Sequence, residues 1–370
     1  MPEAMAHMDM SNIQPRRYHR IGITVLTGFI KDIFIANGCS ESNAQIMANV
    51  CIEADLRGHS IQGIDHIYSI LRDLANGVLI GDAAPRVISD TGATLLIDGA
   101  GCPGYVGGVF AAEQLIEKTR RMGTASAALQ DAGDLFMLGY YAEQFARAGL
   151  IGLVFTNTWP PRVHPAGGID PILGTNPLAI GIPTGAKPIV FDSATSTSAI
   201  GHVRLADYHG EKIAPGIALD ADGVPTTDPG EALQGALTPM AGHKGFGLGL
   251  CIALLSGAMA GGELGSRLDI VARSNDRSLG KRSHLFIAID PAAFGDPTVA
   301  RSRADTYLSE IKAGRRMPGV DEILMPGERS ARARTNNLGQ GVPILAEVWD
   351  RICRFAADAD VAIPSVTGER

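Results

Sequence analysis

Apolar residues recur at helical spacing through the N-terminal part of the chain. Residues 22–37 are mostly apolar, and Gly38 is a typical residue at which a helix ends. A second helix is expected over 40–56, where Ser40 or Ser42 can cap its first turn. A third helix is predicted by four apolar residues at the same spacing, Ile67, Ile70, Leu71 and Leu74. The pattern therefore predicts a helical lobe over 18–80.

Beyond the helical lobe, short apolar runs alternate with longer helical patterns. Strands are expected at 93–97, 125–129, 151–155, 178–182, 187–192 and 285–289, of which 178–182 and 187–192 have the character of buried strands. Helices are expected at 111–122, 140–148, 245–260, 299–313 and 344–357. The glycine-rich stretch 99–108 is typical of a turn. Strands and helices are mixed throughout, so the fold class is α/β or α+β.

One apolar stretch, 245–262, carries no charged residue. A bilayer-spanning helix needs about 20 apolar residues, and this stretch is shorter and rich in glycine. We expect a helix that is fully buried in the core, and no membrane association.

Composition narrows the class of protein. The chain has 370 residues, 45% of them hydrophobic, which is enough for a sizeable core. The net charge of -7 argues against a nucleic-acid-binding surface. The 5 cysteines are scattered without metal-ligand spacing, which favours reduced thiols in a cytoplasmic protein with no metal site. Residues 1–17 are polar and are interpreted as an N-terminal extension.

General nucleotide-binding motifs are missing from the sequence. The stretch Gly99–Gly104 follows a predicted strand, but its spacing does not match the G-x-G-x-x-G fingerprint. No phosphate-binding P-loop pattern is present either. Local motifs alone therefore indicate no nucleotide site.

Several blocks occur in an order typical of one enzyme family. They are Ala54–Gly58, Gly139–Ala142, Pro165–Gly168, Pro171–Pro177, Phe191–Ala199, Gly223–Pro229, Gly242–Leu248, Ala288–Pro291 and Pro326–Glu328. Together they resemble the type-2 malate/L-lactate dehydrogenase family, whose relatives include ureidoglycolate, sulfolactate and diketogulonate enzymes and cyclic ketimine reductases. The resemblance runs from about residue 22 to residue 345.

This resemblance implies a homodimeric oxidoreductase that uses NAD or NADP and has a non-Rossmann fold. A mostly antiparallel NAD(P)-binding domain, placed at 126–264, is inserted between the segments 81–125 and 265–370 of a larger α/β domain. The family pattern places cofactor contacts at Leu173, Gly174, Thr175, Asn176, Pro177, Asp192, Ser193, Ala194, Thr195, His202, His243, Lys244, Gly245, Gly327 and Glu328.

The chain departs from the family pattern at the residues that carry out proton transfer. The family's Ser-His pair falls on Ile61 and Gln62, and its carboxylate-binding Arg falls on His66. A second family His falls on Asp134, and a family Lys falls on His202. Oxidising an alcohol or reducing a carbonyl or imine needs a proton carrier, and Gln62 cannot titrate.

The candidate catalytic residues are therefore His59, His66, Asp134, Asp192 and Gln62. Three hypotheses remain open. A neighbouring group such as His59 or His66 has taken over proton transfer. Alternatively, the scaffold retains NAD(P) but acts on an imine, amine or sugar-acid derivative, or as an isomerase or lyase that uses bound NAD transiently. The third hypothesis is loss of catalysis.

Structural roles compete with each catalytic assignment. His59 can cap a helix end, His66 can be a partly buried structural residue, and Asp134 can cap the helix that follows it. Asp192 can be a buried capping residue, and Lys244 can be solvated or bind a phosphate at a helix N-terminus.

Overall fold

The N-terminal helical lobe forms as its apolar periodicity predicts. A computed structural model describes residues 17–268 and 282–365. The lobe contains α1 (Ile23–Ala36), α2 (Glu41–Leu56) and α3 (Ile67–Ala75), with two short 3₁₀ turns, η2 (Ser60–Gln62) and η3 (Ile64–His66), before α3. Ser40 caps α2, because its hydroxyl accepts a hydrogen bond from the Asn43 N–H at 3.3 Å.

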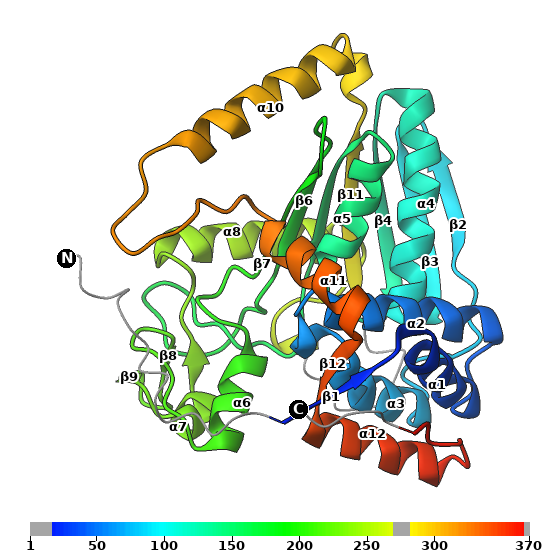
Figure 1. Cartoon of the computed structure of the whole chain (residues 1–370), viewed down its shortest axis with the longest axis vertical. Helices are drawn as coiled ribbons and strands as arrows, with labels where there is room; N and C mark the ends of the chain where they lie inside the picture. The colour runs from blue at the N-terminus through cyan, green and yellow to red at the C-terminus, as the bar shows by residue number, and fades with distance from the viewer. Residues whose placement is uncertain (1–16, 269–281, 366–370) are drawn as a thin grey trace.

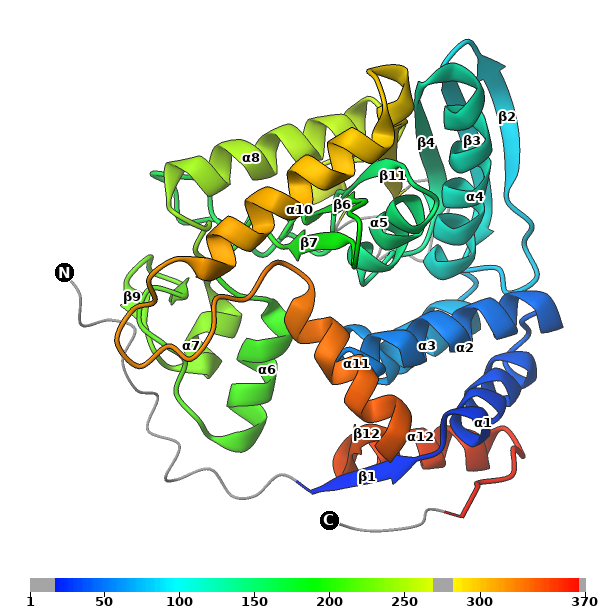
Figure 2. The same ribbon diagram turned by 45° about the horizontal axis from the view of Figure 1, so that its top comes forward.

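The two ends of the described chain meet beside this lobe. Strand β1 (Tyr18–Ile21) pairs antiparallel with β12 (Val342–Leu345), which is followed by α12 (Ala346–Asp358). Figure 2 shows α11 (Glu328–Gln340) leading into this pair. The predicted start of a helix at residue 344 is wrong. A short apolar run fits a strand or a helix equally well, and the available partner β1 decides in favour of a strand.

A seven-stranded sheet forms the centre of the molecule, with the strand order β2-β3-β4-β11-β5-β6-β7 (Figure 1). Its strands are β2 (Arg86–Thr91), β3 (Thr94–Cys102), β4 (Thr124–Ala132), β5 (Ile151–Thr156), β6 (Leu178–Ile182), β7 (Ile189–Ser193) and β11 (Ser283–Ile289). The β3–β4 pair is parallel, and the other neighbours are antiparallel. The predicted mixed fold with a mostly antiparallel, non-Rossmann sheet is confirmed.

Helices cover both faces of this sheet. On one face lie α4 (Gly104–Met122) and α5 (Leu138–Arg147), where Phe286 of β11 meets the ring of Tyr141 edge-on. On the other face Ser283 donates its hydroxyl hydrogen bond to the Ser256 carbonyl in the π-helical turn η4 (Leu254–Ala258), which continues α8 (His243–Ala253). Phe286 and Ser283 point to opposite faces because strand side chains alternate.

Helix α4 begins at Gly104, so residues 104–108 are not the predicted turn. Its glycines allow close packing. A Cβ atom on Gly104 would overlap the carbonyl oxygen of Asp134, and one on Gly108 would lie 2.5 Å from the Tyr141 ring. The prediction failed because glycine is also selected where a helix approaches another backbone closely.

The predicted burial of the uncharged 245–260 helix is wrong. Leu248, Leu250, Leu254 and Met259 are exposed, Met259 by 78%. An apolar composition identifies a surface that avoids water, but it does not say whether the same chain covers that surface. Within the described ranges, no helix is long and apolar enough to cross a membrane. Strands β6 and β7 are also only partly buried, in contrast to the buried strands predicted at 178–182 and 187–192.

A smaller unit lies beside the sheet domain. It consists of α6 (Ile200–His209), α7 (Pro229–Gln234), β8 (Ala218–Leu219), β9 (Pro225–Thr226) and β10 (Ala236–Leu237), with its own apolar cluster around Val203. Helix α10 (Pro297–Ala313) follows β11 and agrees with the helix predicted at 299–313. The central sheet takes strands from both predicted domains, and the domain boundaries themselves stay a prediction.

Close packing of α5 on the sheet yields a prediction about Gly181 of β6. We expect Gly181→Ala to lower the free energy of unfolding by about 2 kcal/mol or more, since the new methyl group would overlap the Ala142 carbonyl oxygen. Gly28→Ala is the matched control, because no atom beyond its chain neighbours and the backbone of its own helix lies within 4 Å of the added methyl group. Urea unfolding measures both variants, and equal stabilities would contradict this packing.

Candidate active site

A cavity of about 660 Å³ lies between the η2–η3 turns, the sheet and α6, and we refer to it as the site cavity. Ten of the residues predicted from sequence line it: His59, Gln62, His66, Asp134, Thr175, Pro177, Asp192, Ser193, Ala194 and His202. The four catalytic candidates other than Asp192 come from η2 and the residue before it, from η3 and from the loop after β4, so the fold brings together residues that are distant in sequence.

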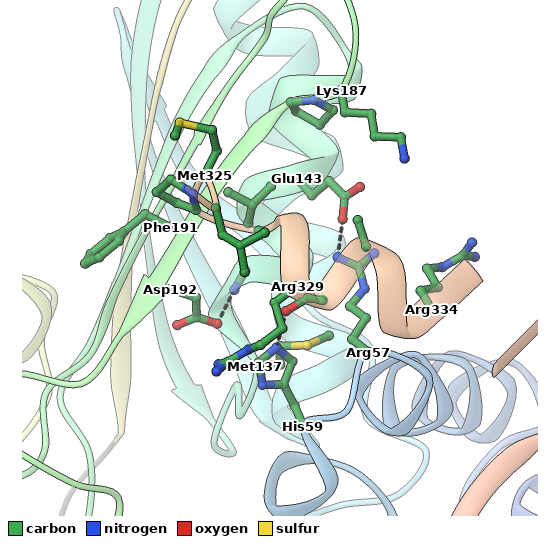
Figure 3. A pocket seen from close by; sticks show the side chains of 18 of the residues that line it. Arg57, His59, Met137, Glu143, Lys187, Phe191, Asp192, Met325, Arg329 and Arg334 are labelled. Carbon is green, nitrogen blue, oxygen red and sulfur yellow. Dashed lines mark hydrogen bonds and ion pairs between the residues drawn. The ribbon is translucent and has the colours of Figure 1, made fainter. Parts of the chain in front are cut away.

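A second cavity of about 700 Å³ adjoins the first, and we refer to it as the basic cavity. The two cavities share three lining residues, His59, Asp192 and Arg329. Figure 3 shows the basic cavity between β7, α5 and α11, with the side chains of Arg57, Lys187, Arg329 and Arg334 around it. Arg147 also lines it. Because the chain as a whole is acidic, this concentration of cations marks a site suited to an anionic ligand.

Asp192 is held in place at the wall between the two cavities. It is near the end of β7, and its carboxylate accepts a hydrogen bond from the Gly139 N–H in the first turn of α5 at 2.7 Å. Burial raises the pKa of Asp192 to about 6, although the Gly139 hydrogen bond opposes the shift. The group therefore changes charge close to neutral pH, in a position that faces both cavities.

The two candidate histidines differ in their surroundings. His59 places its Nε2 2.9 Å from the Ser330 hydroxyl oxygen. Burial lowers the pKa of His59, and the charges of Arg329 and Arg57 lower it further.

The ring of His66 lies 4.6 Å from that of Phe136. Burial also lowers the pKa of His66, while the nearby Asp65 and Asp134 oppose the shift and Arg204 and Arg351 add to it. Both His59 and His66 are thus disposed to be neutral bases.

Asp134 does not cap α5, contrary to one of its predicted structural roles. The N-cap residue is Met137, whose side chain makes no capping bond. Asp134 instead pairs with Arg282 at 3.4 Å, and Arg282 also lies over the ring of Trp159. Among the residues the structure describes, Asp134 Oδ1 and Trp159 Nε1 are buried without a hydrogen-bond partner. Both residues line the site cavity, where a bound ligand can supply the missing partners.

Four predicted cofactor residues hold the local backbone together and lie outside both cavities. The Asn176 amide donates to the Gly249 carbonyl at 3.0 Å, and the Thr195 hydroxyl donates to the Thr175 carbonyl at 2.9 Å. Leu173 pairs with Val163, and Gly174 packs against Thr158. These contacts position Thr175 and Pro177 at the cavity wall.

The remaining predicted cofactor residues are on α8 and α11. His243 and Lys244 are exposed in the first turn of α8, and Gly245 packs on Met240. Gly327 lines the basic cavity, whereas Glu328 forms an ion pair with Lys312 at 2.5 Å. Their contacts with a cofactor stay predictions.

Sequence reasoning missed two arginines at the cavities. Arg329 lines both cavities, and Arg204 of α6 lines the site cavity next to His66. Neither side chain forms a hydrogen bond or ion pair within 17–268 and 282–365. The sequence did contain a signal for Arg329, because this residue directly follows the Pro326–Glu328 block. No feature of the sequence around Arg204 indicates a functional role.

Comparison with known proteins identifies the family of this chain. A family model described as malate/L-lactate dehydrogenase matches residues 21–353. L-sulfolactate dehydrogenase from Methanothermobacter thermautotrophicus is 34% identical over 332 residues, which cover 90% of this chain and 95% of that protein. A Δ1-pyrroline-2-carboxylate/Δ1-piperideine-2-carboxylate reductase from Pseudomonas putida is 34% identical over 330 residues, 88% of this chain and 93% of that protein.

The fold is similar to solved structures as well. The crystal structure of malate dehydrogenase from Entamoeba histolytica superimposes with a TM-score of 0.89 at 26% identity, covering 94% of this chain and 100% of that one. The fold and the sequence similarity are those of dehydrogenases, and this family implies a nicotinamide cofactor. The chain belongs to the malate/L-lactate dehydrogenase family, and the resemblance in its sequence blocks is confirmed.

The raised pKa of Asp192 yields a prediction about stability. The unfolded chain ionises this group near 3.8, whereas the folded protein keeps it protonated up to about 6. The Asp192 contribution to stability is therefore full below pH 4 and is lost as the pH rises through 6. We expect Asp192→Asn to reduce this decline in the free energy of unfolding, by about 1–3 kcal/mol between pH 4 and 7.

Urea unfolding at pH 4, 5, 6 and 7 tests this expectation. The matched control is Asp305→Asn, because Asp305 also accepts a backbone N–H, from Gly185 at 3.1 Å, but at the surface. An Asp192→Asn profile that is parallel to the wild-type profile would refute the assignment.

Proposed function

We propose that the protein transfers a hydride between NAD or NADP and a small substrate that carries a carboxylate, either a 2-hydroxy or 2-oxo acid or an imine. One observation carries the proposal. The site cavity, which is lined by titratable groups, and the basic cavity share three lining residues, His59, Asp192 and Arg329. A dinucleotide can occupy both, with its phosphates among the cations and its nicotinamide near the titratable groups.

The basic cavity supports binding of the dinucleotide phosphates. Lys187 and Arg329 line it without an ion pair within the described ranges, and Arg334 adds a third cation, paired with Glu53. Arginine and lysine are the residues that usually contact phosphate groups. Either NAD or NADP is compatible with this set.

The site cavity supports recognition and protonation of the substrate. We propose that Arg204 holds the carboxylate, since His66 occupies the position of the family's carboxylate-binding Arg. His66 can then exchange the proton of the reacting oxygen or nitrogen, because a buried neutral imidazole is a base suited to this step. The relatives named for sulfolactate and for cyclic imine carboxylates support both substrate classes.

We also propose that the enzyme is a cytoplasmic homodimer. The exposed apolar residues Leu248, Leu250, Leu254 and Met259 form a face suited to a second copy of the chain. His243 and Lys244 lie at the start of the same helix segment, so a dimer on this face would surround them with further groups. All 5 cysteines are free, which is compatible with a reducing compartment.

The first test is a fluorescence titration with NADH and NADPH. We expect the wild type to bind one of them, and Arg329→Met to weaken that binding by about tenfold, since a charged hydrogen bond to an anion contributes about 1.5–3 kcal/mol. The matched control is Arg332→Met, because Arg332 is on the same helix but pairs with Glu322 at 2.5 Å. Failure of the wild type to bind either nucleotide would contradict the proposed function.

A second test concerns the proton carrier. We expect His66→Asn to reduce turnover by about 10²–10⁴-fold, because a general acid–base group contributes this much. His59→Asn should reduce turnover less, since His59 already bonds Ser330. Absorbance of the reduced nicotinamide is followed with L-sulfolactate, L-malate and Δ1-pyrroline-2-carboxylate. Unchanged turnover in His66→Asn would exclude this role, and bound cofactor with no net redox change would favour an isomerase or lyase.

A further inference from the structure

A buried histidine lies directly behind the wall of the site cavity. His284 is on β11, where it is the cross-strand partner of Thr156 on β5, and its side chain is completely buried. Its Nε2 lies 3.0 Å from the Gly133 carbonyl oxygen, and its Nδ1 lies 2.7 Å from the Thr156 hydroxyl oxygen. Thr156 is 2% exposed and lines the site cavity. His284 therefore connects the residue before Asp134 to the cavity wall.

The hydrogen-bond partners determine which ring nitrogen of His284 carries a proton. A carbonyl oxygen can only accept, so the Nε2 facing Gly133 must be the donor. Burial lowers the pKa of His284 to about 3, so the ring is neutral and carries a single proton. Its Nδ1 therefore offers a lone pair, and the Thr156 hydroxyl must donate its hydrogen to it.

A hydroxyl group has one hydrogen and two lone pairs. Since the hydrogen of Thr156 is directed to His284, the hydroxyl has only lone pairs left for another group, and Thr156 lines the site cavity. Thr156 accepts no side-chain hydrogen bond from the residues that the structure describes. A buried acceptor of this kind favours a ligand atom that donates an N–H or O–H and disfavours one that offers only a lone pair.

We infer that Thr156, fixed as an acceptor by His284, orients a ligand through a neutral N–H or O–H donor. Thr156 would be a ligand contact and His284 a positioning residue. The inference rests on the proposed function for the identity of that donor, which has two possible sources. One is the carboxamide NH₂ of nicotinamide, and the other is the O–H or N–H on the reacting carbon of the reduced substrate.

Cofactor analogues test the first source. In 3-acetylpyridine adenine dinucleotide and its phosphorylated form, a methyl group replaces the carboxamide NH₂ and removes the donor. If the carboxamide is the ligand, we expect wild-type protein to bind the reduced amide cofactor about tenfold or more tightly than the reduced acetyl analogue. Thr156→Val should lose this preference and Thr156→Ser should keep it, as measured by fluorescence titration.

Titration of the substrate pair tests the second source. L-malate carries a hydroxyl where oxaloacetate carries a carbonyl, so the pair differs in donating ability at one position. If the substrate is the source, calorimetric titration should show a preference for L-malate that is lost in Thr156→Val and kept in Thr156→Ser. The inference is overturned if the wild type discriminates in neither arm, or if Thr156→Val retains every preference.

The role of His284 has its own test. His284→Asn retains an acceptor oxygen near the position of Nδ1 and should keep the preference, whereas His284→Leu frees the Thr156 hydrogen and should reduce or reverse it. Because His284→Leu can prevent folding, ¹⁵N NMR of the wild-type ring provides an independent readout. We expect a neutral ring protonated at Nε2 at pH 7, and a ring protonated at Nδ1 would overturn the inference.

The tests with cofactor analogues, with the substrate pair and by NMR distinguish a failure of the inference about Thr156 from a failure of the proposed function. Binding of neither NADH nor NADPH contradicts the proposed function and leaves the substrate pair and the NMR measurement to decide the role of Thr156. Binding of a nicotinamide cofactor without discrimination in either arm supports the proposed function and refutes the role of Thr156.

Discussion

Removal of water from the wall of the site cavity is the constraint on which the site depends. Burial shifts acids and bases in opposite directions, but toward the same neutral state. It raises the pKa of Asp192 to about 6 and lowers that of His284 to about 3. The wall therefore holds a neutral imidazole, that of His284, and a carboxyl group, that of Asp192, whose charge changes close to neutral pH. Charged arginines line the same cavities from α6 and α11.

This arrangement depends on strands that are distant in the sequence. Strand β11 pairs antiparallel with both β4 and β5, although the chain between β5 and β11 includes the smaller unit and α8. Its pairing places His284 between Gly133 and Thr156. At the far edge of the sheet, β7 brings Asp192 to the start of α5. The sheet thus acts as the frame that sets the distances between the polar groups of the site.

Local patterns predicted much of the fold but only part of the site. The 3.6-residue period specified α1 and α3, since each buries one side, whereas α2 is buried around most of its circumference. It failed at residue 344, where the apolar run pairs with β1 instead. The family blocks led to Asp192, His59 and His66, which do line the site cavity. Arg204 and the contact between His284 and Thr156, 128 residues apart, depend on tertiary structure and leave no local signal.

The central position of β11 also affects the order in which the protein folds. Before Ser283–Ile289 has left the ribosome, β4 and β5 lack the strand that separates them, and each presents an unpaired edge. Pairing across such a long stretch of chain is slow, because the entropy of closing the loop must be overcome first. Nascent chains of this protein therefore pass through a stage with two exposed strand edges, at which association with other chains competes with folding.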